Sequence, residues 1–332
     1  MSRQLIGVDA GGTKTTVASL REGALDEPLT VPTEKASSAA LVDQIAQMVG
    51  RVRSPDAVAV GVGVPSVVDI STGRVQTSVN VPLADVPLRS ALEERLGLHV
   101  VVDNDANCAA LAEAYEGERI TVQNLVMLTV GTGIGGGLVL GGHLYRGATG
   151  GAAELGQTLI GVETEEGAPP AGRFPQPGSL EALASGRALE TLALAGGYSG
   201  GRMLVDAAHD GDEGARALIA LIGERLGIGI ANAINTFDPE EMVIGGGVAA
   251  GAGELLLAPA SETARRFTLP GVGEQTEIRL ARHGVLASVR GAALLALHET
   301  ELASHGIRAA PRAAAGARLS RVRDAFRIRG RG

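Results

Sequence analysis

Hydrophobic and polar positions along the chain form short apolar runs that end in glycine-rich turns. The clearest example spans residues 125–148, where apolar and β-branched residues 125–130 lead into the glycine-rich segment 131–137 and apolar residues 138–140 follow. Short β-branched runs on both sides of glycines predict a strand, a turn and a second strand. Because glycine has no side chain, the backbone N–H groups of such a turn can face an anion at close range. Phosphate binding is therefore one interpretation of this hairpin.

Two other interpretations of the same segment stay open. The spacing Gly131-x-Gly133-x-x-Gly136 also fits the dinucleotide-binding fingerprint, which needs a helix directly after the glycines. A β-branched run that leads into Gly141-Gly142 is a poor start for a helix, which argues against that fingerprint. The remaining alternative is a hairpin with a purely structural role.

A second copy of the pattern near the start of the chain favours phosphate binding. Residues 5–9 predict a strand, residues 10–14 a glycine turn, and residues 15–18 a second strand. The two hairpins lie about 120 residues apart, which indicates two similar half-domains that face one nucleotide. Asp9 ends the first strand and supplies a carboxylate where a nucleotide-bound Mg²⁺ needs one.

The remaining segments predict an α/β protein. Helical spacing of apolar residues predicts helices, and short apolar runs that end at polar or proline residues predict buried strands. The expected helices cover residues 37–52, 88–96, 108–113, 179–186, 215–235 and 285–297, and the expected strands cover residues 56–64, 100–102 and 241–244. Residues 67–82 and the Pro- and Gly-rich residues 163–178 predict loops. This order fits an α/β domain that binds ligands at strand ends.

A cluster of polar residues directly follows the strand at 100–102. It contains Asp103, Asn104, Asp105 and Asn107, and a helix is expected after it. Asp and Asn are favoured helix N-caps, so a capped helix is the simplest interpretation. One cap is enough for a helix, however. The additional carboxylates and amides suit the binding of sugar hydroxyls, with one carboxylate left as a base.

Composition and charge narrow the classes of function. The chain has 332 residues, enough for about two domains, and only 2% of them are aromatic, so the cores must be aliphatic. The net charge of −8 argues against nucleic-acid binding, which demands a basic face. No apolar run approaches a membrane span and no signal-peptide pattern precedes the first strand, so we expect a cytoplasmic protein with no membrane partner. The single cysteine, Cys108, excludes an intrachain disulfide and a multi-cysteine metal site.

Several ordered motifs resemble those of the ROK family of sugar kinases and sugar-responsive repressors, within the actin and hexokinase superfamily. The resemblance runs from residue 5 to about residue 297. Its motifs are Asp9-Ala10-Gly11-Gly12-Thr13-Lys14, Gly63-Val64-Pro65, Asn104-Asp105-Ala106-Asn107, Gly131-Thr132-Gly133-Ile134-Gly135-Gly136-Gly137, Glu154-Leu155-Gly156, Leu180-Glu181-Ala182-Leu183-Ala184-Ser185-Gly186 and Gly245-Gly246-Gly247. Each motif alone is weak, but their order and spacing are specific.

The resemblance implies an α/β fold with two RNase-H-like domains, of the actin and hexokinase type, around a central cleft. The expected N-terminal domain comprises residues 1–118 plus 285–300, the expected C-terminal domain comprises residues 119–284, and residues 301–332 form an Arg-rich tail without fixed order. A homo-oligomer, either a dimer or a tetramer, is also implied by the family resemblance.

The resemblance also implies roles for individual residues. Asp105 matches the catalytic base, which takes the proton from the sugar 6-hydroxyl as that oxygen attacks the γ-phosphate of ATP. Asp9 matches the residue that holds Mg²⁺ through a water molecule. The expected sugar contacts are Asn80, Asn104, Asp105, Glu154, Gln157 and Glu181. The expected ATP contacts are Gly11, Gly12, Thr13, Lys14, Thr132, Gly133, Gly245, Gly246 and Gly247.

The chain departs from the family pattern around its zinc site and beside the first domain's Gly-Val-Pro motif. Gln157 stands where the family usually has a histidine that touches sugar and binds a structural zinc, and the Pro/Gly loop ending at Ser179 replaces the usual cysteine cluster. The departures imply a variant without zinc. Ser66 stands where the family commonly has glycine, and both changes bear on which sugar is bound.

Three functions follow from the resemblance. The first is an ATP- and Mg²⁺-dependent hexose kinase, with glucose as the default substrate. The second is a sugar-responsive repressor, which needs a DNA-binding module before the first glycine motif. We expect no such module, since only eight residues precede Asp9. The tail at 306–332 has eight arginines but shows no helix-turn-helix pattern. The third is a non-catalytic sugar-binding relative, against which the retained Asp105 and both hairpins argue.

Overall fold

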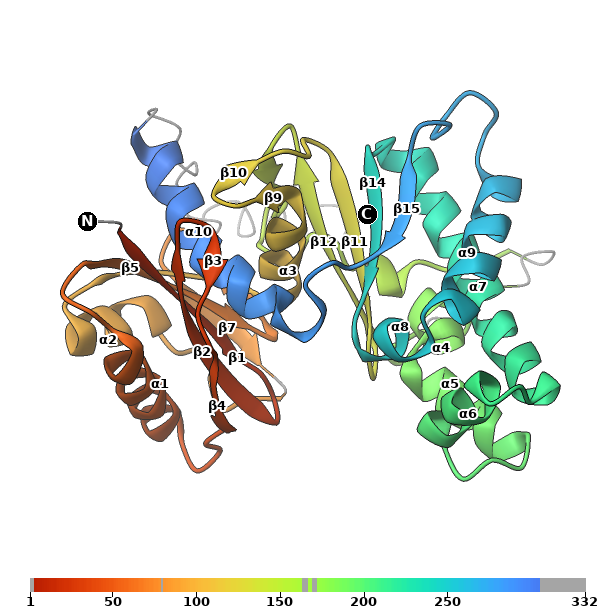
Figure 1. Cartoon of the computed structure of the whole chain (residues 1–332), viewed down its shortest axis with the longest axis horizontal. Coiled ribbons are helices and arrows are strands. Elements are labelled where there is room, and N and C mark those ends of the chain that lie inside the picture. Colours follow the sequence, from red (N-terminus) through yellow and green to blue (C-terminus); the bar gives the residue numbers. More distant parts are fainter. Residues whose placement is uncertain (1–2, 79, 163–166, 169–171, 305–332) are drawn as a thin grey trace, which may run out of the picture.

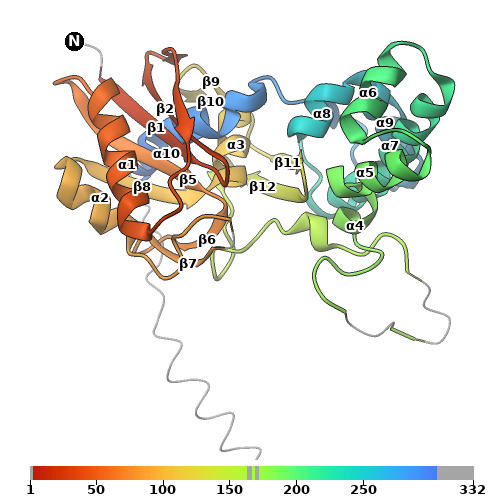
Figure 2. The same ribbon diagram turned by 90° about the horizontal axis from the view of Figure 1, so that it is seen from below.

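The computed structural model describes residues 3–78, 80–162, 167–168 and 172–304. Within these residues two mixed β-sheets lie in separate halves of the molecule (Figure 1). The view turned by 90° shows the same two halves, with helices α3 (Asp105–Ala114) and α10 (Ala287–Ser304) between them (Figure 2). The candidate site is built where the strands of the two halves end.

The first sheet has six strands among the described residues, in the order β3-β2-β1-β5-β8, with β4 also paired to β2. The strands are β1 (Gln4–Ala10), β2 (Lys14–Arg21), β3 (Ala24–Leu25), β4 (Leu29–Pro32), β5 (Ala57–Val64) and β8 (His99–Asn104). Because β5 pairs in parallel with both β1 and β8, the carboxyl ends of these strands meet at one edge. Asp9 and Asp103 each pair with Gly63 there.

Helices cover both faces of this sheet. Helices α1 (Ser38–Val52) and α2 (Leu88–Leu96) lie on the outer face, and α3 and α10 lie on the face toward the second half (Figure 1). Helix α10 comes very close to the sheet, since a Cβ at Gly7 would lie 1.9 Å from the Val289 carbonyl oxygen. Glycine in β1 therefore lets the last described helix pack on the first sheet.

The second sheet repeats the arrangement and, in the part of the chain that the structure describes, has five strands in the order β13-β12-β11-β14-β15. They are β11 (Leu125–Val130), β12 (Ile134–Leu140), β13 (His143–Leu144), β14 (Glu241–Gly245) and β15 (Glu277–Leu280). As in the first sheet, an antiparallel hairpin, here β11–β12, continues into parallel strands. Both strand–turn–strand predictions, at the start and in the middle of the chain, are confirmed.

The helices of the second half pack on this sheet and on one another. They are α4 (Leu180–Ala184), α5 (Gly186–Ala195), α6 (Gly201–His209), α7 (Glu213–Phe237), α8 (Gly247–Ala252) and α9 (Glu254–Phe267). By length and composition alone, α7 could cross a membrane, and it is the one such helix among the described residues. Its side chains at Ile219, Ile222, Leu226 and Ile230 are fully buried in the aliphatic core, which identifies α7 as a core helix.

The structure also corrects parts of the sequence-based outline. Residues 67–82 were expected to form a loop, but β6 (Ser66–Asp69) and β7 (Arg74–Ser78) pair there as a two-stranded ribbon. The single helix expected at 179–186 is divided, because Ser185 caps the start of α5. The last helix extends through Ser304, and the rest of the expected tail, residues 305–332, lies outside the described residues.

Four short elements complete the described part of the chain and connect the larger ones. The short strands β9 (Tyr115–Glu116) and β10 (Arg119–Ile120) pair after α3, η1 (Leu155–Gln157) precedes the loop to α4, and η2 (Gly284–Leu286) leads into α10. The exact domain boundaries given above stay a prediction.

Candidate active site

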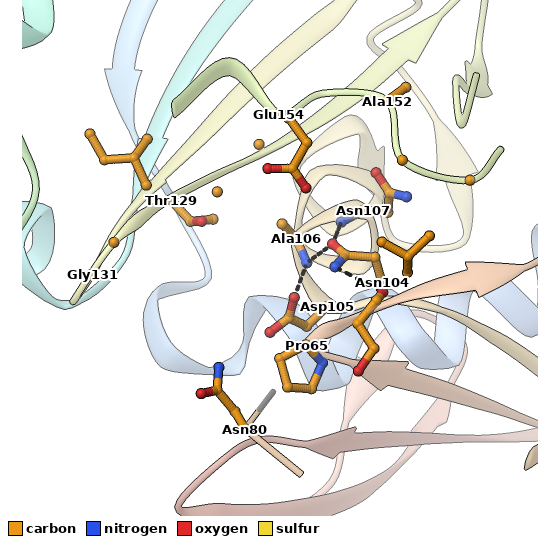
Figure 3. A pocket seen from close by; sticks show the side chains of 18 of the residues that line it. Pro65, Asn80, Asn104, Asp105, Ala106, Asn107, Thr129, Gly131, Ala152 and Glu154 are labelled. Carbon is orange, nitrogen blue, oxygen red and sulfur yellow. Dashed lines mark hydrogen bonds between the residues drawn. The ribbon is translucent and has the colours of Figure 1, made fainter. Parts of the chain in front are cut away.

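A cavity of about 460 Å³ opens where the two sheets face each other (Figure 3). Its walls come from both halves of the chain, since Asn104 and Asp105 lie at the end of β8 and the start of α3, whereas Gly133 lies in the β11–β12 turn. The structure brings the following sequence-predicted residues to this cavity: Asn80, Asn104, Asp105, Gly133, Glu154, Glu181 and Gly246.

A smaller cavity of about 170 Å³ adjoins the first. Asp9 and Ser288 line only this smaller cavity, whereas Asp105, Thr129 and Gly246 line both. Asp105 therefore stands at the boundary between the two spaces. A side chain in that position can contact one ligand in each cavity at the same time.

The turn from β8 to α3 determines how Asp105 is presented. Asn104 is the N-cap of α3, and its Oδ1 accepts hydrogen bonds from the backbone N–H groups of Ala106 and Asn107. The capping role is thus filled by Asn104, as the sequence allowed. The Oδ1 atom of Asp105 accepts a hydrogen bond from the N–H of Ala106 at 2.8 Å, and the carboxylate keeps further lone pairs for a ligand (Figure 3).

Burial changes the acidity of both aspartates. Burial raises the pKa of Asp105, and the backbone N–H groups of Ala106 and of Asp105 itself offset only part of that effect. For Asp9, burial and then the charge of Asp105 raise the pKa to about 6, against smaller opposing effects of Ser288 and Lys14. A carboxylate with a raised pKa is a stronger base, and two such carboxylates around one small cavity attract a cation.

Glu181 holds the second glycine hairpin in place. It lies in the first turn of α4, and its Oε2 accepts a hydrogen bond from the backbone N–H of Ile134 at 2.9 Å. A Cβ at Gly133 would lie 2.6 Å from the same oxygen, so the hairpin passes directly beneath the carboxylate. The charge of Glu181 also raises the pKa of Glu154, after the larger effect of desolvation, which places these two carboxylates near each other at the cavity.

A comparison with known protein families decides the identity of this arrangement. The ROK family model matches residues 5–299. This chain belongs to the ROK family. Among curated ROK relatives, the glucokinase of Halalkalibacterium halodurans is 34% identical over 317 residues, which is 88% of this chain and 94% of the relative. The N-acetyl-D-glucosamine kinase of Aliivibrio fischeri is 35% identical over 303 residues, which is 87% of this chain and 98% of the relative.

Solved ROK structures share the fold. The ROK hexokinase from Thermus thermophilus is 36% identical, with a TM-score of 0.77 over 90% of this chain and 99% of that chain. The ROK family glucokinase from Streptomyces griseus, in complex with glucose and AMPPNP, is 32% identical, with a TM-score of 0.72 over 89% of this chain and 99% of that chain. The predicted fold class, an α/β protein of the actin and hexokinase type, is confirmed.

The remaining expected ATP contacts of this ROK chain lie around the cavities without lining them. The turn with Gly11, Gly12, Thr13 and Lys14 joins β1 to β2, and a Cβ at Gly12 would lie 3.1 Å from Cβ of Asn80, a cavity residue. Thr132, Gly245 and Gly247 flank cavity-lining residues of the second half and do not themselves line either cavity. The two hairpins thus approach the site from opposite halves of the molecule.

Gln157 differs from the expectation for a sugar contact. It lies in η1, it does not line either cavity, and its Oε1 is buried without a hydrogen-bond partner among the described residues. The structure therefore does not bring Gln157 to the cavity walls, although Glu154, three residues before it, lines the larger cavity.

Sequence reasoning missed buried charged residues that join the two halves of this ROK fold. Arg279 of β15 donates a hydrogen bond to Glu113 of α3 at 2.7 Å and also pairs with Glu241 of β14. Arg146, after β13, pairs with Asp103 beside the β8–α3 turn that carries Asp105. The one available signal was a charged residue inside an otherwise apolar segment, such as Glu113 in α3.

Proposed function

We propose that this ATP-dependent ROK sugar kinase transfers the γ-phosphoryl group of ATP to the 6-hydroxyl of a hexose, with glucose as the first candidate. The observation that carries the proposal is the position of Asp105, a half-buried carboxylate of raised pKa at the boundary of two adjoining cavities. The larger cavity is lined by several amide and carboxylate side chains, which suit a sugar. The smaller one, with Asp9, suits the phosphate end of a nucleotide and its cation.

In the proposed reaction Asp105 accepts the proton of the 6-hydroxyl while that oxygen attacks the γ-phosphorus. Carboxylate and amide groups of Asn80, Asn104, Glu154 and Glu181 orient the sugar through its other hydroxyls. Backbone N–H groups of the two glycine hairpins contact the phosphate oxygens, whose charge they stabilise.

Mg²⁺ bound to the nucleotide phosphates would neutralise their charge, and the residues of the smaller cavity fit such an ion. Asp9 is the residue that would hold it, through a water molecule. No group of three or more His, Cys, Asp or Glu side chains that could ligate a metal occurs in the described part of the chain. Such a small number of carboxylates fits Mg²⁺, which proteins bind through one or two carboxylates while phosphates and waters supply the other ligands.

The choice between glucose and N-acetylglucosamine is part of the proposal. Glucokinases and N-acetyl-D-glucosamine kinases are equally similar to this chain, at 34% and 35% identity. Glucose is favoured because a relative of 32% identity with the same fold is a glucokinase in complex with glucose and AMPPNP. N-acetylglucosamine is the second candidate.

We also propose that the segment between η1 and α4 folds without zinc. In support, the chain has one cysteine, Cys108, which is buried in α3, and Gln157 offers no imidazole. The same account places the protein in the cytoplasm as a homo-oligomer, with an N-terminal domain of residues 1–118 plus 285–300 and a C-terminal domain of residues 119–284.

A substrate panel tests the proposal. The protein is incubated with ATP, Mg²⁺ and one sugar at a time, and ADP release is followed by a coupled assay. Glucose is expected to give the highest kcat/KM, with N-acetylglucosamine and mannose lower. The matched control is 6-deoxyglucose, which retains the ring hydroxyls but offers no 6-hydroxyl; it is expected to inhibit competitively without turnover. ADP release with 6-deoxyglucose equal to that with glucose, or no turnover of any hexose, would contradict the proposal.

A further inference from the structure

A buried arginine from the second half of the chain reaches the catalytic turn of the first half. Nε of Arg146 donates a hydrogen bond to Oδ2 of Asp103 at 2.6 Å, and its Nη2 donates to Oε1 of Glu299 at 2.6 Å. The side chain of Arg146 is 14% exposed and that of Asp103 is 2% exposed. Charge-assisted hydrogen bonds in such a buried place are among the strong ones, because little water screens them.

Asp103 connects Arg146 to two residues that line the larger cavity. Its Oδ1 accepts hydrogen bonds from the backbone N–H of Asn104 at 2.7 Å and from Nδ2 of Asn107 at 2.9 Å. Both asparagines line the larger cavity beside Asp105 (Figure 3). A shift of the Asp103 carboxylate would therefore move the start of α3, and with it Asp105.

Arg146 also begins the loop that forms another wall of the cavity. Its carbonyl oxygen accepts a hydrogen bond from the N–H of Ala152 at 3.1 Å. Gly150, with φ of +82°, approaches β6 so closely that a Cβ there would lie 2.2 Å from the carbonyl oxygen of Val68. Residues 146–154, here called the cavity loop, thus lie against the first half, although the strand before them belongs to the second sheet. Gly150, Ala152 and Glu154 of this loop line the cavity.

We propose that Arg146 is a positioning residue, which fixes the cavity loop to the turn carrying Asp105, so that most of the sugar site is assembled before ATP binds. The inference rests on the proposed function. In this arrangement Asn104, Asn107 and the cavity loop move as one unit. Glu181 and the second glycine hairpin form the opposite wall and do not depend on Arg146.

The inference separates sugar binding from nucleotide binding. Without the Arg146 contact, the cavity loop and the start of α3 lose their fixed spacing, and a sugar must order them on binding. Hexose affinity should then fall, whereas contacts of ATP with the two hairpins should be retained. A role in folding alone would lower stability but would leave the ratio of the two affinities unchanged.

The experiment uses Arg146→Lys and Asp103→Asn in the full-length protein. Lysine keeps the charge but has one ammonium group, which cannot reproduce the two separate N–H contacts to Asp103 and Glu299. Asparagine keeps an oxygen for Asn104 and Asn107 but loses the charge that Arg146 binds. The matched control is Arg290→Lys, since Arg290 is buried in α10 and donates to the carbonyl oxygens of Gly23 and Gly117, away from both cavities.

Glucose binding without nucleotide is measured by titration calorimetry, and KM for glucose, KM for ATP and kcat are measured by the coupled assay. In both test variants the glucose Kd should rise by roughly tenfold or more, because small displacements of positioned groups are costly. KM for ATP should change by less than about twofold. The glucose Kd of the double variant should be no higher than that of the more affected single variant, because both changes break the same contact between Arg146 and Asp103. Arg290→Lys should leave the glucose Kd unchanged even where it lowers the melting temperature.

Each outcome decides the matter. An unchanged glucose Kd in either folded test variant overturns the inference, and so does an equal loss of glucose affinity in Arg290→Lys. In both cases the activity of the wild type still supports the proposed function. Additive losses in the double variant also overturn it. If the wild type phosphorylates no hexose, the proposed function fails, and the inference fails with it.

Discussion

Asp9 of β1 and Asp105, the first residue of α3 directly after β8, line the same small cavity, and the charge of Asp105, second to burial, raises the pKa of Asp9 to about 6. Only Asp105 also lines the larger cavity. The two carboxylates therefore have different neighbours and are assigned different tasks. In the proposed reaction Asp9 serves the nucleotide and its cation, and Asp105 serves the sugar hydroxyl.

Replacement of Asp9 by asparagine is expected to weaken the use of Mg²⁺ without an effect on sugar binding. Loss of a carboxylate that holds a metal through water typically lowers metal affinity or activity by roughly 10- to 100-fold. The Mg²⁺ concentration for half-maximal activity should rise accordingly, since Asp9 does not line the sugar cavity. Kinetics over a Mg²⁺ series, with glucose calorimetry as the control, check this. An unchanged Mg²⁺ dependence would remove Asp9 from the assignment.

Gly133→Ala is expected to impair the site more than the fold. The added Cβ would lie 2.6 Å from Oε2 of Glu181, which is the end of a flexible side chain and can move away. KM for glucose should rise by roughly tenfold as Glu181 is displaced, while the free energy of unfolding should fall by less than about 1 kcal/mol.

Gly61→Ala is the contrasting control for that variant. Its Cβ would lie 1.7 Å from the backbone carbonyl oxygen of Ala292 in α10, which cannot move without the helix. A loss of about 3 kcal/mol or more is expected. Urea unfolding of both variants measures the difference, and equal losses of stability would contradict this account of the two glycines.

The two strand–turn–strand units and the polar turn at Asp105 could be predicted because their signals are local. A β-branched run, a set of glycines and a second run stand next to one another in the sequence, and Asn104 and Asp105 directly follow an apolar strand. The ribbon of β6 and β7 was missed because its two strands are short and only half-buried, so their alternation of apolar and polar positions is weak.

Contacts that depend on distant parts of the chain could not be predicted. Arg146 is 43 residues from Asp103 and 153 residues from Glu299, and an arginine after a short strand has the pattern of an exposed loop residue. The approach of α10 to Gly7 likewise depends on how the last helix returns to the first sheet. No local pattern contains this information, since the partners meet only in the folded chain.

His298 is expected to make the folded protein less stable in acid. Burial lowers the pKa of His298 from 6.5 to about 4; the charges of Arg146 and His143 add to this effect, whereas the charges of Glu299 and Asp103 oppose it. The unfolded chain therefore binds the proton more tightly. The free energy of unfolding is fully retained above pH 6.5 and falls as the pH drops toward 4, by about 2 kcal/mol on reaching pH 5.

Urea unfolding at pH 8 and pH 5 checks this contribution. His298→Phe removes the titrating ring and should lose that part of the pH dependence. Tyr115→Phe is the matched control, because it removes the hydrogen bond between Tyr115 Oη and His298 Nδ1 but keeps the ring. If His298→Phe and the wild type lose equal stability between the two pH values, the burial of a neutral His298 does not control the acid response.

Zinc is expected to be neither present nor needed. Elemental analysis of the purified protein should find far less than one zinc per chain, and a chelator should leave the melting temperature unchanged, since Gln157 and the single Cys108 cannot supply a set of four nitrogen and sulfur ligands. One tightly held zinc per chain, released only on unfolding, would refute this.

The most direct test of the central claim is the kcat of Asp105→Asn with glucose, ATP and Mg²⁺. Asparagine keeps the shape of the side chain and an oxygen for the N–H of Ala106, but it cannot accept the hydroxyl proton. The variant should bind glucose with near wild-type affinity in calorimetry and lose roughly 100- to 10,000-fold in kcat. Folded protein with a kcat within about threefold of wild type would contradict the assignment of Asp105 as the base.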